Sequence, residues 1–297
     1  MMNRMRLLAY PLMFAMIMGV GLIGCKKKTK KANKTTQSSK APKTLSKDAL
    51  AQALSSKKCD PKSSNDSLSI PDAGELYNLV KGMGVGEKLQ ASLKKSPVKL
   101  DTAKGAATAF VLGLALAEQT LTLSPKNLDK ALPQVKSIYE KAKAANLLDK
   151  ASQKQVSKLL KKLEKVKKTK EFRSFLALVR AEFLKRMREP KHRYNAMLVL
   201  SGGLLLSYHE ISKAAIGNAK AASQVGEIFS FADPVQMLAT ELGTCFAKQT
   251  ATDKGLQKIV ASLKSLEKLL SGHKGKFESK TFQSIANITG GALQLFR

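Results

Sequence analysis

Apolar residues recur along this chain at helical spacing, and no segment alternates between apolar and polar residues for long enough to predict a strand. The clearest helices are two strongly apolar segments, 106–123 and 194–216, and a basic amphipathic stretch over 150–188. Further helices are predicted over 46–55, 73–94, 125–148, 235–248, 253–270 and 279–296. The pattern predicts an all-α fold, an irregular multi-helix bundle of about eight to ten helices.

The two apolar segments are predicted to be buried core helices. Their uncharged parts, 106–117 and 196–208, are followed by Glu118 and by His209-Glu210 and are shorter than the roughly 20 residues that a membrane span needs. Aromatic residues make up 5% of the chain and Trp is absent, so we expect a core of Leu, Ala, Val, Ile and Met.

A weak internal similarity suggests two similar helical halves, 106–168 and 194–270. Each begins with an apolar helix that contains glycine and continues with a long lysine-rich amphipathic helix. Helical hairpins commonly share this pattern, so the interpretation as a duplication stays open.

The first 24 residues have the layout of an export signal peptide. Arg4 and Arg6 precede an apolar run, 7–23, that ends in Leu22-Ile23-Gly24-Cys25. These last four residues resemble the lipobox of bacterial lipoproteins. The resemblance implies that a diacylglycerol joins the thiol of Cys25, that the signal is cut before this residue, and that its new amino group can be acylated as well. The alternative is an uncleaved signal anchor with an incidental cysteine.

Residues 25–44 are predicted to form a disordered, lysine-rich tether between the acylated Cys25 and a helical domain over 45–297. The tether contains eight lysines and no acid, and it has no apolar periodicity. It is either a generic spacer or a segment that contacts lipid headgroups. Lys26 is not the acidic retention signal of enterobacterial lipoproteins, so the resemblance favours the periplasmic side of the outer membrane of a bacterial envelope.

The chain is strongly basic, with 52 Lys and Arg against 22 Asp and Glu and a formal net charge of +30. About +20 remains without the signal peptide and the tether lysines, and a charge of this size favours anionic partners such as phospholipid or cell-wall glycan. The other interpretation is that lysine populates solvated helix faces. Nucleic acid is not expected, because aromatic residues rarely interleave with the basic stretches. The candidate anionic-partner residues are Lys158, Lys161, Lys162, Lys165, Lys167 and Lys168.

Cys59 and Cys245 are a candidate disulfide, since two cysteines remain after Cys25 is assigned and an envelope is oxidising. The alternative is that both are small buried apolar residues. His192, His209 and His273 are scattered, so we expect no metal site, and no motif indicates a cofactor.

One enzymatic resemblance is weak. Glu278-Ser279, followed by Gly290-Gly291-Ala292-Leu293-Gln294, is similar to the Glu-Ser…Gly-Leu-Met-Gln pattern of lytic transglycosylases. The resemblance implies that Glu278 protonates a glycosidic oxygen. The spacing differs and Leu-Met-Gln is absent, so we predict that the protein is not an enzyme.

The sequence therefore predicts a lipid-anchored, non-enzymatic envelope lipoprotein. Its helical domain would act as a scaffold or binding module for an envelope protein or an anionic envelope polymer. The alternative is a periplasmic carrier that binds a lipid or small apolar ligand between the helices 106–123 and 194–216; a large enclosed apolar pocket there would favour it.

Overall fold

The computed structural model describes residues 86–95, 97–123, 128–166, 168–186, 192–218, 225–226, 229, 232–273 and 276–296, all within the unit formed by residues 47–297. These residues form ten α-helices, one 3-10 turn and one π-helical turn, and they contain no strand. The predicted all-α bundle is therefore confirmed. The predicted signal peptide, the tether, Cys25 and Cys59 lie outside the described residues.

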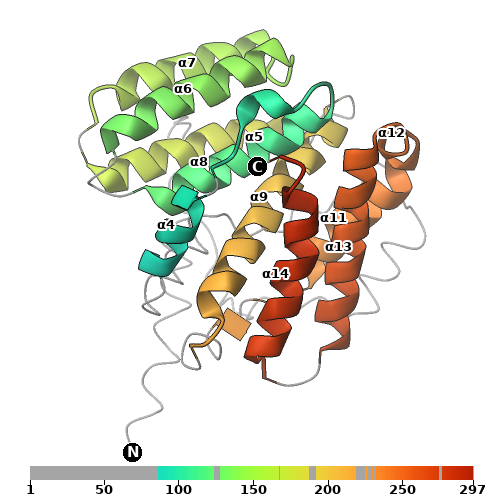
Figure 1. Ribbon diagram of the computed structural model, residues 1–297. Helices are drawn as coiled ribbons and strands as arrows, with labels where there is room; N and C mark the ends of the chain where they lie inside the picture. Colours follow the sequence, from blue (N-terminus) through green and yellow to red (C-terminus); the bar gives the residue numbers. More distant parts are fainter. Residues whose placement is uncertain are drawn as a thin grey trace, which may run out of the picture. The chain divides into compact units, whose positions relative to one another are not determined.

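Figure 1 shows the helices in chain order. They are α4 (Gly86–Lys95), η2 (Leu100–Thr102), α5 (Ala107–Thr122), α6 (Leu128–Ala144), α7 (Lys150–Leu163), α8 (Thr169–Arg186), α9 (Arg193–Ala215), α11 (Asp233–Thr240), the π turn η4 (Glu241–Cys245), α12 (Ala247–Thr250), α13 (Lys254–Gly272) and α14 (Ser279–Leu293).

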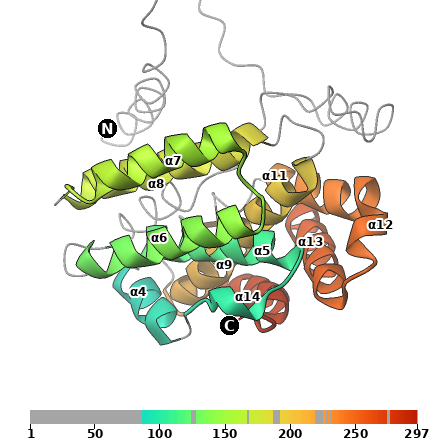
Figure 2. The ribbon, with the colours of Figure 1, turned by 90° about the horizontal axis from the view of Figure 1, so that it is seen from above.

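Helix α9 lies between two groups of helices (Figure 1). On one side it packs against α5 and α8, and α6 and α7 form an outer layer over α5 and α8 (Figure 2). On the other side it packs against α14, with α13 and α11 following in turn. Helix α9 is buried on nearly all faces, and its middle part, 196–208, carries no charged residue.

Helices α5 and α9 share the largest interface of the fold, and they cross at two glycines. A Cβ atom on Gly113 would collide with the carbonyl oxygen of Val199, and one on Gly202 would collide with the carbonyl oxygen of Phe110. The two backbones are therefore in direct contact, which only residues without a side chain permit.

This crossing is locally symmetric. Each glycine lies against the residue three positions before the other glycine, so the two helices run past each other in opposite senses. The symmetry is compatible with two similar helical halves, which stay a prediction. The direct backbone contact also leaves no room at the crossing for the ligand that the carrier alternative places between these helices.

Both apolar helices are core helices, as the sequence predicts. Fourteen consecutive or near-consecutive positions of α5, from Ala107 to Leu121, are buried, and each fully buried Leu contributes about 1.5–3 kcal/mol to folding. Among the described residues, no helix is long and apolar enough to cross a membrane.

Two groups of aromatic rings pack within the core. The rings of Tyr208 and Phe229 are stacked with centroids 4.3 Å apart, and the ring centroid of Phe282 lies 5.9 Å from that of Phe229. The ring of Phe296 lies 5.2 Å from that of Phe110, which links the segment after α14 to the α5–α9 crossing.

Two predicted helices are divided in the structure. The amphipathic stretch 150–188 is interrupted after Leu163, where α7 ends and the chain turns back into α8. The predicted helix 235–248 was wrong as a single element, because α11 passes into the π turn before α12 begins. Pro133 lies inside α6 without ending it.

The glycine crossing predicts a sharp difference between glycine substitutions. Gly113→Ala or Gly202→Ala should lower the free energy of unfolding by about 2–3 kcal/mol, because backbone atoms must move to admit each methyl group. Gly291→Ala is the matched control: it lies in α14 with no atom near the new Cβ. This control should raise stability by about 0.5–1 kcal/mol, since Ala is the better helix former. Urea unfolding followed by circular dichroism measures all three, and equal effects would contradict the crossing.

Candidate functional site

The outer face of α7 carries a row of exposed lysines. Lys150, Lys154, Lys158 and Lys161 follow one another at spacings of four, four and three residues, and all are exposed. Residues with these spacings share one face of a helix. The opposite face, with Val156, Leu160 and Leu163, is buried. No acidic residue lies between Lys150 and Leu163. We call Lys150, Lys154, Lys158, Lys161 and Lys162 the α7 lysine face.

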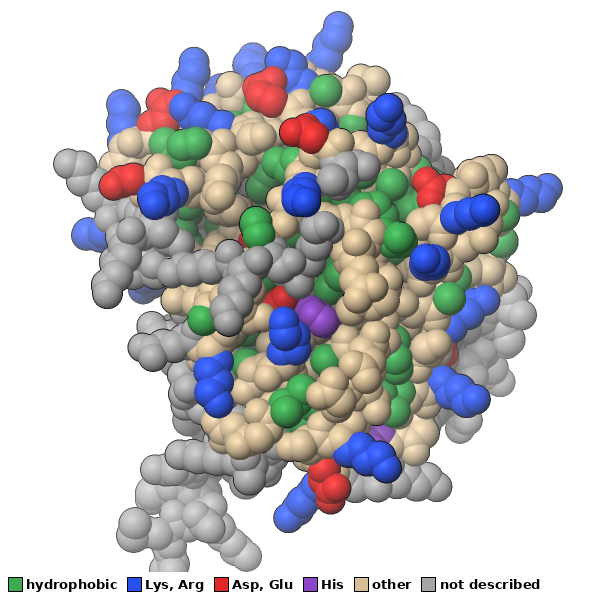
Figure 3. Space-filling model, viewed as in Figure 1, with side chains coloured by type: hydrophobic (Ala, Val, Ile, Leu, Met, Phe, Trp, Pro, Cys, Tyr) green, Lys and Arg blue, Asp and Glu red, His purple; other side chains and the backbone are tan. Residues whose placement is uncertain are grey.

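The structure brings together most of the lysines that the sequence singled out. Lys158, Lys161 and Lys162 belong to the α7 lysine face, Lys165 follows it, and Lys168 lies directly before α8; all five are exposed. Lys167 lies outside the described residues. Sequence analysis missed Lys150 and Lys154, although their four-residue spacing from Lys158 was the signal that extends the row. Figure 3 shows Lys and Arg side chains gathered at the edge of the molecule formed by α6 and α7.

One carboxylate lies at the end of the α7 lysine face. Glu164 accepts a charge-assisted contact of 2.6 Å from Lys136 of α6. The hydrogen bond and positive charge of Lys136, with smaller contributions from Lys161 and Lys165, hold the pKa of Glu164 below its ordinary value. Glu164 forms its ion pair with Lys136 of α6, and within the described residues no lysine of the α7 lysine face forms an ion pair.

A buried ion pair connects the start of α9 to the π turn. The guanidinium of Arg193 donates to the carboxylate of Glu241, and the two side chains are only 6% and 12% exposed. Burial raises the pKa of Glu241, and the charge and hydrogen bond of Arg193 oppose that shift. Next along the chain from Arg193, the ring of Tyr194 packs against that of Phe246, with centroids 5.2 Å apart. Because both side chains are shielded from water, each charge is stabilised by the opposite charge of the other residue.

The remaining buried carboxylates are also held by the chain. Glu118 accepts the backbone N–H of Val98 at 3.1 Å and so fixes the entry into α5. The carboxylate of Glu210 is fully buried, and the ammonium of Lys213 lies 3.9 Å away while also donating to Ser92 of α4 at 2.7 Å. Glu118 therefore links α5 to the segment before η2, and Lys213, beside Glu210, links α9 to α4.

The residues of the enzymatic and metal alternatives do not converge. Glu278 is exposed and lies directly before α14, as its N-cap residue. The Nδ1 atom of His209 lies 3.0 Å from the carbonyl oxygen of Ala286, so this ring bridges α9 and α14. In the described part of the chain no three His, Cys, Asp or Glu side chains gather as a metal site.

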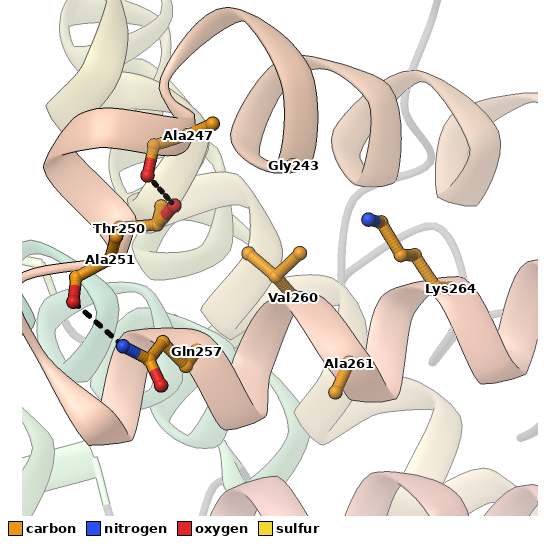
Figure 4. A pocket seen from close by; sticks show the side chains of 8 residues that line it. All are labelled: Gly243, Ala247, Thr250, Ala251, Gln257, Val260, Ala261 and Lys264. Carbon is orange, nitrogen blue, oxygen red and sulfur yellow. Dashed lines mark hydrogen bonds between the residues drawn. The ribbon is translucent and has the colours of Figure 1, made fainter.

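A shallow groove of about 310 Å³ lies between the π turn with α12 on one side and α13 on the other. Figure 4 shows its walls: small residues from the first side, and Gln257, Val260, Ala261 and Lys264 from α13. Cys245, the last residue of the π turn, is disulfide-bonded. The pairing of Cys59 with Cys245 stays a prediction, since Cys59 lies outside the described residues.

The buried ion pair predicts strong coupling between two positions. Arg193→Met and Glu241→Leu should each lower the free energy of unfolding by about 3–5 kcal/mol, because each leaves a buried charge without its partner. The double variant should lose much less than the sum of the two, since no buried charge remains. Urea unfolding at pH 7 of the four proteins measures the coupling, and additive losses would show that the pair is not formed.

Comparison with protein-family models, with curated proteins and with solved structures finds no match to this chain.

Proposed function

We propose that this protein is a lipid-anchored envelope lipoprotein whose helical domain binds anionic headgroups or polymers of the envelope through the α7 lysine face. The observation that carries the proposal is the single-sign charge of that face: five exposed lysines on one helix without an intervening acid. The role requires no catalytic group.

The α7 lysine face differs from the exposed surface of α6 in the signs of its charges. On α6 the exposed lysines alternate with acids: Asp129 and Lys130 are neighbours, and Lys143 lies 3.7 Å from Glu140. An ordinary solvated face mixes both signs in this way. The α7 lysine face has no acid within it; its flanking acids are Asp149, before Lys150, and Glu164, after Leu163, so the positive charges between them add together.

The size of the face suits an extended anionic surface. Lys162 lies twelve positions after Lys150, which corresponds to about 18 Å along the helix axis. Each lysine near an anionic leaflet contributes about 1 kcal/mol, so several must act together to hold the domain. An anchor at Cys25 would supply the main membrane attachment, and the lysine face would then orient the domain against the surface.

A four-lysine variant tests the binding face. Lys150, Lys154, Lys158 and Lys161 are replaced by Gln in residues 26–297, which lack the proposed anchor. Association with vesicles of phosphatidylglycerol and phosphatidylcholine should weaken at least tenfold, and binding of the unchanged protein should fall as salt is raised. Vesicle co-sedimentation across a salt series measures both effects.

The matched control removes the same charge elsewhere. Lys248, Lys254, Lys258 and Lys268 are also exposed but lie on α12 and α13. Their replacement by Gln should change binding less than threefold. Equal losses in the two variants would mean that net charge alone governs binding, and an unchanged four-lysine α7 variant would rule out the α7 face.

The anchor has its own test. In cells labelled with an alkyne-bearing palmitate analogue, the full-length protein should carry label and should lack residues 1–24 by mass spectrometry. Cys25→Ala should abolish the label and leave residues 1–24 attached, so no cleaved protein should be found in the membrane fraction. Label that survives this substitution would contradict lipidation at Cys25.

A further inference from the structure

Helix α14 carries almost no charge, in contrast to the other long amphipathic helices of this basic chain. Helices α6, α7 and α13 contain four, five and four lysines, whereas α14 contains only Lys280. The sequence has no charged residue from Thr281 to Phe296, although charged residues make up 25% of the whole chain. In Figure 3 the surface over α14 is mainly tan, and Lys and Arg side chains gather toward the edges of the view.

The exposed residues of α14 form one stripe along the helix. Gln283, Asn287 and Gly291 follow one another at spacings of four, and all are exposed. Gln294 and Leu295 extend the stripe past the end of the helix, and Leu295 is 40% exposed. The other sides of α14 pack against α9 and α13. We call these five residues the α14 amide face.

Among the described residues, nothing packs against the position that a side chain on Gly291 would occupy. A Cβ atom there would have no atom within 4 Å, whereas one on Gly290 would lie 3.0 Å from Cε1 of His209. Glycine inside a helix is less favourable than alanine, because it loses more conformational freedom on folding. Packing on α9 therefore accounts for Gly290 and not for Gly291. At an exposed position, glycine gives another molecule access to the helix backbone.

The amide side chains of this face can both donate and accept hydrogen bonds. The Nε2 atom of Gln283 donates to Oδ1 of Asn287 at 3.0 Å. The NH₂ group of Asn287 and the carbonyl oxygen of Gln283 then remain as a donor and an acceptor that face solvent. A surface that presents both groups is complementary to a second copy of itself, because a two-fold axis brings each donor to the acceptor of the other copy.

The charge of the chain favours a second copy as the occupant. Two copies with a formal net charge of +30 each repel one another, so they can approach most closely where neither surface carries lysine. An anionic partner would instead gain most from the lysine-rich helices. The α14 amide face therefore has the charge that self-association requires and lacks the charge that an anionic partner would recognise.

We propose that two copies of this protein associate through their α14 amide faces, with the two α14 helices crossing at Gly291 about a two-fold axis. The crossing would repeat between chains the backbone contact that Gly113 and Gly202 make within one chain. This association is independent of the proposed function, since it requires neither the lipid anchor nor the α7 lysine face.

The size of the face indicates a reversible dimer. Helix α14 has 15 residues and is therefore about 22 Å long. One helix face of this length is smaller than the surface of about 800 Å² that each partner buries in a standard stable complex. The population of the dimer should therefore depend on protein concentration.

Two glycine variants test the crossing. Sedimentation velocity of the full-length protein in a non-ionic detergent, over a concentration series, should show a monomer–dimer equilibrium. Gly291→Ala should weaken dimerisation at least fivefold, even though it stabilises the folded monomer. Gly272→Ala is the matched control: it is exposed at the end of α13, and its new Cβ also has no atom within 4 Å. This control should change dimerisation less than twofold.

Charge and salt test the nature of the contact. Asn287→Lys places like charges on both faces and should weaken dimerisation at least tenfold, whereas Ser265→Lys, exposed on α13, should change it less than twofold. Raising the salt from about 0.1 M to about 1 M should strengthen the dimer of the unchanged protein, because the screening length falls from about 10 Å to about 3 Å.

Photo-cross-linking in intact cells tests the face in the native envelope. With p-benzoylphenylalanine in place of Gln283 or Gln294, cross-links should join two copies of the chain and should map to residues 279–296 of the second copy. The same probe in place of Ser265 should give at least fivefold fewer cross-links between copies.

The other outcomes each overturn the proposal. A monomer at every concentration would exclude the dimer, and a dimer that weakens as salt rises would mean that anions bridge the lysines of two copies. Equal losses for Gly291→Ala and Gly272→Ala would remove the crossing, and cross-links to a different protein would assign the face to that protein. None of these results bears on vesicle binding by the four-lysine α7 variant, so the two proposals fail separately.

Discussion

The contact between the backbones of α5 and α9 is the constraint on which the rest of the fold depends. Because Gly113 and Gly202 allow the two helices to touch, they form one central unit with apolar side chains around it. Helices α4, α6 and α8 pack on the α5 side of this unit, and α14 packs on α9. Separating the two central helices by the width of one methyl group would shift the surfaces on which all of these helices pack.

The sequence predicted which segments form helices better than it predicted which helices pack against each other. The two apolar helices were identified from run length and composition, and Asp253 was correctly placed at the start of α13, where its carboxylate accepts from Gly255 and Leu256. Helical periodicity defines a buried face but not what lies against it, so the glycine crossing could not be derived. The π turn was missed for a related reason: inserting one residue into a helix leaves the apolar pattern on either side intact.

For the candidate site, local spacing was informative and distant pairing was not. The lysines of α7 were visible as a basic amphipathic stretch, since an uninterrupted run on one helix needs only the order of residues. Arg193 and Glu241 are separated by 48 positions and gave no signal as a pair. In the sequence Glu241 lies among the apolar residues Leu238, Ala239 and Leu242, but only the fold shows that a guanidinium shares its burial. Within the described residues, the lysines of the α7 lysine face form no ion pair, whereas the buried charges of Arg193 and Glu241 pair with each other.

The glycine crossing also bears on how distant relatives of this protein can be recognised. Surface lysines can be exchanged for other polar residues with little effect on folding, so overall sequence similarity decays quickly in a protein of this composition. Positions 113 and 202 have no such freedom, since every other amino acid brings a Cβ atom into the opposite backbone. Two glycines, each inside an uncharged helical stretch (106–117 and 196–208) and about 90 residues apart, would persist as the evolutionary signature of this architecture after the rest of the sequence has diverged.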